Sequence, residues 1–96
     1  MFSTDFHIAL YGYLQTLTGN SKIEDCDNYI ESSPLYDQTE YGYASSYRST
    51  SYKTLPTMIR NHIDHPDNAY SYNDTQLKKS TLFLIELINE YKRTHP

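Results

Sequence analysis

Hydrophobic side chains recur every three or four residues in four stretches of the chain, a spacing typical of amphipathic helices. The first stretch, residues 4–18, follows Ser3 or Thr4 as the N-cap and ends before Gly19 or Asn20. Its apolar positions are Phe6, Ala9, Leu10, Tyr13, Leu14 and Leu17. We expect a helix here, with these side chains along its apolar face.

Two shorter helices are predicted further along the chain. Residues 22–31 follow a Ser21 cap and form a short acidic segment, with Ile23, Cys26, Tyr29 and Ile30 as its apolar positions. The next stripe comprises Leu55, Met58, Ile59, His62 and Ile63. Because Pro66 disfavours helical geometry at the preceding residue, we expect this third helix to end at His65.

The last stretch, roughly residues 74–92, predicts the longest helix, with Asn73 or Asp74 as the N-cap. Its face comprises Leu77, Thr81, Leu84, Ile85, Ile88 and Tyr91. Residues 32–53 are rich in serine, threonine and tyrosine and almost lack aliphatic side chains, which predicts a long loop or a loose hairpin. We therefore expect one all-α domain over residues 1–96, a bundle of three to four helices.

Composition narrows the environment and the class of partner. The net charge of −4 argues against a general nucleic-acid binder. Residues 41–63, however, contain no acidic residue. Cys26 is the only cysteine, which excludes an intrachain disulfide and favours a reducing, cytoplasmic location. The first residues lack the basic start of a signal peptide, and the longest apolar run, residues 82–85, is far too short to span a bilayer.

Residues 60–68 read RNHIDHPDN and gather basic, acidic and imidazole side chains directly after the third apolar stripe. Arg60 and Asp64, four residues apart, would pair on a helix surface, and His62 or His65 would then lie at the core edge. A metal site is a second interpretation, since four side chains are of ligand type: His62, Asp64, His65 and Asp67. The two histidines would need further ligands, and no carboxylate-rich helix clearly supplies them.

RNA cleavage by Arg60 and His65 is a third interpretation. An arginine holds a phosphate and stabilises the charge that builds during transfer. A histidine acts as general acid or base on a ribose 2′-hydroxyl or a leaving 5′-oxygen, and this chemistry needs neither a metal nor a cofactor. Positions i and i+5 lie about 140° apart around a continuous helix. The two side chains therefore converge only if the helix end unwinds or a second subunit completes the site.

The spacing Arg60-Asn61-x-x-x-His65 resembles the R-x4–6-H motif of the HEPN superfamily. A longer pattern, TLPTMIRNHIDHPDN at residues 54–68 followed by YNDTQLKKS at residues 72–80, extends the likeness. It resembles the C-terminal region of ABC/AAA-type ATPases from bacterial anti-phage defence systems, and ALYGYLQ at residues 9–15 is similar to the start of that region.

The resemblance implies an all-α, metal-independent endoribonuclease of the toxin or anti-phage effector type. Two copies would face each other, with Arg60 on the phosphate, His65 as the catalytic histidine and Asn61 orienting both. Expected partners are RNA, with transfer RNA among the substrates, a second copy and a separate ATPase. The chain carries no P-loop glycine signature. A non-catalytic interaction module or domain mimic that binds such an ATPase is therefore the alternative.

Aromatic and basic residues alternate in the acid-free segment that precedes Arg60. Tyr47, Arg48, Tyr52 and Lys53 are the candidates for RNA contact, because aromatic rings stack on unpaired bases and cations hold the backbone. Tyrosine is also common in protein interfaces, so docking on a protein partner remains the alternative for this segment.

Overall fold

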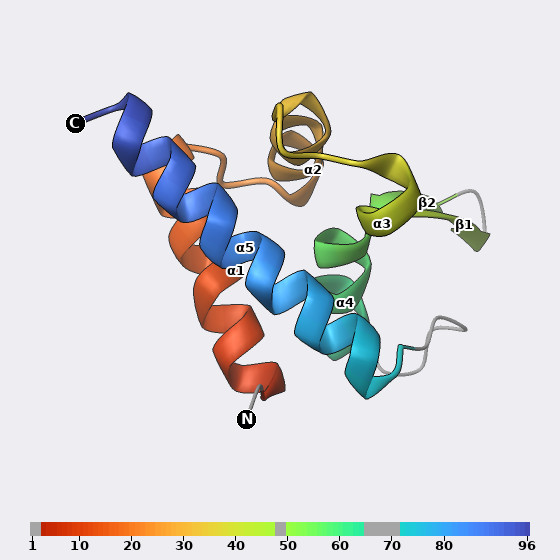
Figure 1. Ribbon diagram of the computed structural model, residues 1–96. Helices are drawn as coiled ribbons and strands as arrows, with labels where there is room; N and C mark the ends of the chain where they lie inside the picture. Colours follow the sequence, from red (N-terminus) through yellow and green to blue (C-terminus); the bar gives the residue numbers. More distant parts are fainter. Residues whose placement is uncertain (1–2, 48–49, 65–71) are drawn as a thin grey trace.

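Five helices and one β-hairpin make up the computed structural model, which describes residues 3–47, 50–64 and 72–96 (Figure 1). Side chains are described for residues 3–43, 54–62 and 72–96. The elements in chain order are α1 (Thr4–Thr18), α2 (Ile23–Ser32), α3 (Gln38–Tyr41), β1 (Gly42–Tyr47), β2 (Thr50–Thr54), α4 (Leu55–Asp64) and α5 (Asp74–Thr94). The predicted small all-α fold is confirmed. The described residues form five helices instead of the predicted three to four, because the one-turn helix α3 was not expected.

Helix α1 has the predicted bounds because both ends are capped. The Ser3 hydroxyl accepts a hydrogen bond from the Phe6 amide at 3.1 Å, and Gly19 closes the helix at φ 74°, a left-handed conformation that glycine adopts without strain. The predicted apolar face is only partly right. Phe6 and Tyr13 are 43 % and 41 % exposed. The buried positions are His7, Tyr11 and Leu14.

Two polar atoms on this buried face have partners, whereas His7 Nδ1 is buried without a hydrogen-bond partner among the described residues. His7 Nε2 lies 2.7 Å from Ser80 Oγ, and the Tyr11 hydroxyl lies 3.1 Å from Thr57 Oγ1. Paired polar atoms avoid the cost of burial, so these large side chains can fill the interior. The hydrophobicity pattern therefore predicted a buried face of α1 that is rotated about the helix axis from the face that the structure buries.

The ends of α2 and α5 depend on different residues. Asn73, one of the two predicted N-cap residues, caps α5, and it does so through a reciprocal capping box with Gln76. The predicted Ser21 cap of α2 is wrong. That helix begins one residue later, with Lys22 at the N-cap position and no side-chain hydrogen bond. The Ser21 carbonyl instead accepts a hydrogen bond from the Gln15 side chain at 3.4 Å.

The described residues between 32 and 53, namely 32–47 and 50–53, form more regular structure than a long loop. Of the two predicted alternatives, the hairpin is confirmed, with β1 and β2 antiparallel and Ser45 opposite Tyr52. One turn of helix, α3, precedes the hairpin. Gly42 joins the two, and a Cβ there would collide with the Gln38 carbonyl oxygen, so glycine permits this close approach. Threonine and tyrosine favour strands, whereas serine is common in turns, which explains the ambiguous pattern.

The hydrophobic core has two parts. The larger cluster joins α1, α2 and α5 and comprises Tyr11, Leu14, Cys26, Ile30, Phe83, Leu84, Leu87 and Ile88. The smaller cluster joins α4 to the start of α5 and comprises Leu55, Met58, Ile59 and Leu77. Helices α1 and α5 run side by side in the same direction, since His7 contacts Ser80 and Tyr13 contacts Lys92 (Figure 1). Tyr41 of α3 stacks on Phe83 with ring centroids 3.9 Å apart.

Burial of His7 makes the fold sensitive to acid. Burial lowers the pKa of His7 from 6.5 to about 4. The unfolded chain therefore binds a proton between these pH values that the folded chain excludes. Stability from the neutral imidazole is complete above pH 6.5 and is lost as the pH falls to about 4.

We predict that this single group lowers the free energy of unfolding by about 3 kcal/mol between pH 6.5 and 4. Chemical denaturation at a series of pH values would measure it. His7→Gln keeps a polar partner for Ser80 but does not titrate. The slope of its unfolding free energy against pH should therefore be smaller, by the equivalent of one proton. His95→Gln, at an exposed position, is the matched control. Equal slopes for wild type and His7→Gln would show that His7 is not the acid-sensitive group.

Candidate functional site

Helix α4, which carries the first half of RNHIDHPDN, is attached to the rest of the protein at its first turn. The Thr54 hydroxyl donates a 2.6 Å hydrogen bond to Asp27 Oδ1 on α2, and the Thr57 amide lies 3.4 Å from the same hydroxyl oxygen. Met58 and Ile59 are fully buried. The candidate residues that follow are therefore carried by a helix with a rigid attachment to α2 and the smaller core cluster.

Arg60 lies half-buried on α4, one turn after Thr57. Its guanidinium carbon is 5.9 Å from the centre of the Tyr11 ring, and its Nη1 atom is buried. A cation at this distance from the face of an aromatic ring is attracted by the ring's negative face. The structure thus holds the predicted phosphate-binding arginine against a core tyrosine of α1.

Asn61 and His62 face different surroundings. Asn61 is only 6 % exposed, so it belongs to the interior side of α4. The His62 ring meets the Tyr72 ring edge-on with centroids 5.2 Å apart. Its Nδ1 atom is buried and has no hydrogen-bond partner among the residues that the structure describes. This geometry agrees with the interpretation of His62 as a histidine at the edge of the core.

Several predicted site residues lie beyond what the structure describes. His65, Arg48 and Asp67 are outside the described residues. Tyr47, Tyr52 and Lys53 are placed by their backbone in the hairpin, without a described side chain. Strand β2 leads directly into α4, so this tyrosine-rich strand and Arg60 belong to one continuous stretch of structure. Arg60 and Asn61 are brought together, and convergence of Arg60 with His65 stays a prediction.

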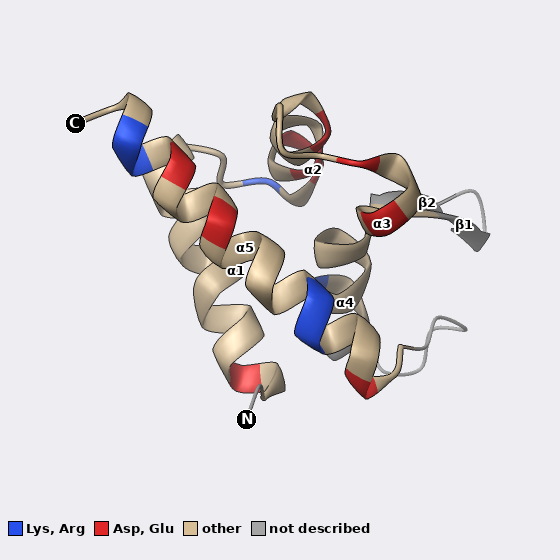
Figure 2. Ribbon diagram, in the orientation of Figure 1, with Lys and Arg blue, Asp and Glu red and all other residues tan. Residues whose placement is uncertain are grey.

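Charge is distributed unevenly over the helices. Acidic segments mark α2, α3 and the C-terminal half of α5, and basic segments mark the beginning and the end of α5 (Figure 2). Helix α2 alone carries Glu24, Asp25, Asp27 and Glu31. By contrast, residues 50–62, from β2 into α4, contain no acid. Lys53 and Arg60 lie in this acid-free stretch, and the first acid after it is Asp64 at the end of α4.

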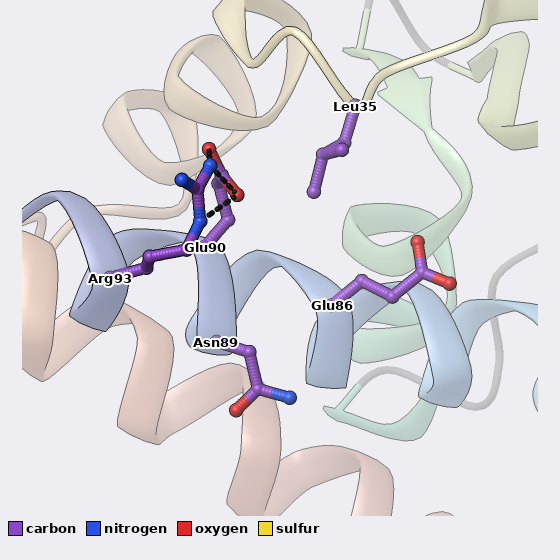
Figure 3. A pocket seen from close by; sticks show the side chains of 5 residues that line it. All are labelled: Leu35, Glu86, Asn89, Glu90 and Arg93. Atoms are coloured by element: carbon purple, nitrogen blue, oxygen red, sulfur yellow. Dashed lines mark hydrogen bonds and ion pairs between the residues drawn. The ribbon is translucent and has the colours of Figure 1, made fainter.

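A separate surface pocket of about 320 Å³ lies between α5 and the connection from α2 to α3 (Figure 3). Its lining comprises Leu35, Glu86, Asn89, Glu90 and Arg93. Arg93 and Glu90 pair within the pocket at 2.6 Å, and none of the lining residues belongs to α4. The pocket is open and mixed in charge, with its one arginine already engaged by a carboxylate.

Neither a metal cluster nor a membrane span is found in the described part of the chain. No group of three or more His, Cys, Asp or Glu residues is close enough there to hold a metal ion. None of the described helices is both long and apolar enough to cross a bilayer. Three of the four predicted metal-ligand side chains, those of Asp64, His65 and Asp67, lie outside this set, so the metal interpretation is not tested.

The comparisons with known proteins do not assign a family. No protein-family model, curated protein or solved structure matches the chain. The HEPN resemblance therefore stays a prediction that depends on the residues themselves.

Sequence reasoning missed Tyr11 and Thr57, the two side chains that meet at the Arg60 face of α4. Tyr11 belongs to a hydrophobic segment near the start of the chain, and its hydroxyl partner lies 46 residues away. The only early signal was the repeat of His7 and Tyr11 four residues apart on a predicted helix. Contacts this far apart in sequence leave no periodic trace, so the structure was needed to find them.

We predict that the bond from Thr54 to Asp27 holds the candidate site in place. Asp27→Ala should lower the free energy of unfolding by about 1–3 kcal/mol, because it leaves the buried Thr54 hydroxyl without its acceptor. Urea denaturation would measure the loss. Asp25→Ala, at an exposed position of the same helix, should change stability by less than about 0.5 kcal/mol. A double-mutant cycle with Thr54→Val that shows no coupling would contradict the prediction.

Proposed function

We propose that the chain is a metal-independent endoribonuclease of the toxin or anti-phage effector type that acts in the cytoplasm. Arg60 binds the scissile phosphate, and His65 exchanges protons with the ribose 2′-hydroxyl and the leaving 5′-oxygen. Asn61 supports the two from the interior side of α4. Transfer RNA is the first substrate to test, and 2′-hydroxyl attack would leave a cyclic phosphate.

The observation that carries the proposal is the placement of Arg60. Its guanidinium is half-buried against the Tyr11 ring, on a helix whose first turn is bonded to α2. A cation restrained in this way needs little reorganisation when charge builds on a phosphate, which is the property that makes electrostatic catalysis effective. The R-x4-H spacing and the acid-free stretch around it add support.

A second copy of the chain is part of the proposal. Arg60 and His65 are five positions apart, about 140° around a regular helix, so one uninterrupted helix would point them in different directions. Two copies that face each other would bring the arginine of one to the histidine of the other. The proposed enzyme is therefore a homodimer.

We predict that purified wild-type protein cleaves total transfer RNA in the presence of EDTA. Arg60→Ala and His65→Ala should each lower the cleavage rate at least about 100-fold. The first variant removes the phosphate contact, and the second removes the proton transfer. Gel separation of the products and assay of their cyclic phosphate ends would follow the reaction. EDTA also removes divalent metal ions, so cleavage under these conditions argues against the metal interpretation.

The matched controls are a surface arginine and a surface histidine. Arg93→Ala and His95→Ala change exposed residues near the end of α5 and should cleave at the wild-type rate. Thermal unfolding of all four variants would confirm that each is folded. Cleavage that persists in Arg60→Ala and His65→Ala would come from a contaminant, and the proposal would then be abandoned.

A non-catalytic interaction module that binds a defence-system ATPase is the second candidate. Phe6, Tyr13 and Leu82 are each more than 40 % exposed, and they are the large hydrophobic side chains exposed in the described part of the chain. Exposed apolar side chains of this size are typical of binding surfaces. This candidate requires no activity from the Arg60 motif.

We predict for this candidate that the protein co-purifies with an ATPase from its host and cleaves no RNA at high concentration. The double variant Phe6→Ser with Tyr13→Ser should lose the complex, because it removes two apolar contacts without touching the core. Thr16→Ser, an exposed change on the same helix, is the control. A complex that survives the double variant would exclude this face of α1 as the binding surface.

A further inference from the structure

We infer that Tyr11 is a positioning residue that sets the direction of the Arg60 guanidinium, an inference that rests on the proposed ribonuclease function. Tyr11 comes from α1, far from the motif in sequence, and contacts α4 at two points. The ring lies beneath the guanidinium, 5.9 Å from centre to Cζ, and the hydroxyl bonds Thr57 Oγ1 at 3.1 Å.

Both contacts of Tyr11 are made with the same face of α4. Thr57 and Arg60 are three residues apart on the helix, so their side chains lie on the same side, one turn above the other. A tyrosine that bonds the first residue must present its ring to the second. The geometry therefore couples the hydroxyl contact, which fixes the ring, to the cation contact, which fixes the arginine.

Tyr11 itself is enclosed by the core. Its side chain is fully buried in the larger core cluster, beside Cys26 of α2. Burial is the main cause that raises the pKa of its phenol, with the nearby Cys26 contributing, so the hydroxyl stays protonated at physiological pH. A neutral, enclosed ring is a constant support for the cation, independent of small changes in pH.

Positioning is useful because arginine is a long side chain with many rotamers. The ring limits the orientations of the guanidinium, and the Arg60 side chain is partly exposed. An arginine in place before the substrate arrives loses less conformational entropy on binding. Loss of the Tyr11 ring should weaken phosphate binding by Arg60 without abolishing it.

The direct test is the nuclear magnetic resonance signal of the Arg60 side chain. A proton above an aromatic ring is shielded, so the Arg60 Nε–H resonance should lie upfield in wild type and in Tyr11→Phe and should move downfield in Tyr11→Leu. Tyr13→Leu is the matched control, because it removes a ring of the same helix that lies near Lys92. An Arg60 resonance unchanged in Tyr11→Leu would overturn the inference, whatever the RNA assay shows.

The functional test compares ring chemistry at constant shape. A trifluorinated phenylalanine at position 11 fills the same space but removes the negative ring face, so it should lower kcat/KM for RNA about three- to tenfold relative to phenylalanine. This pair stays informative even if Tyr11→Leu fails to fold. Equal kcat/KM values for the two rings would overturn the inference. Arg60→Ala should erase the difference between them.

The two proposals fail separately. If wild type cleaves no RNA, the ribonuclease function fails, and with it the catalytic meaning of Tyr11, even where the resonance shift shows that the ring holds Arg60. If wild type cleaves RNA but neither the resonance nor kcat/KM depends on the ring, the function stands and Tyr11 is a core residue only.

Discussion

The arrangement of this small protein depends on the polar atoms that α1 buries. An unpaired polar group in a core costs more than a paired one returns, so a buried polar atom that forms a hydrogen bond favours one placement of its partner. His7 sets α1 against α5 through Ser80, and Tyr11 sets α1 against α4 through Thr57. Hydrophobic contacts tolerate sliding, whereas these two bonds define the positions of three helices relative to one another.

The sequence predicts the helices better than it predicts their faces. The bounds of α1 and the start of α5 follow from local chemistry, namely Ser3, Gly19 and the Asn73 capping box. The buried face of α1 depends on partners 46 and 73 residues away, so a hydrophobicity pattern chose Phe6 and Tyr13 while the structure buries His7 and Tyr11. Local rules describe backbone geometry, and only tertiary contacts decide which polar side chains can be buried.

The candidate site also has one part that local sequence features suggest and one part that only tertiary contacts reveal. Residue type and spacing suggest Arg60 as a phosphate ligand, whereas the suggested role of Asn61 follows from the HEPN resemblance alone. The ring beneath Arg60 was not predictable, because Tyr11 had the appearance of an ordinary hydrophobic position in an N-terminal helix. The hairpin that leads into α4 was ambiguous for a third reason, since its threonine and tyrosine favour strands while its serine favours turns and loops.

Stability and the proposed activity share one structural element in this protein. The contacts of α4 with Tyr11 and Asp27 stabilise the fold, and the same helix carries Arg60 half-buried against the Tyr11 ring. A surface arginine on a mobile loop would gain reach but would have to be ordered with each substrate. An arginine on a helix that is bonded to two other helices is ordered when the protein folds. Its side-chain entropy is therefore lost on folding and not again each time a substrate binds. The polar core is therefore the feature that makes a phosphate site on so short a chain physically reasonable.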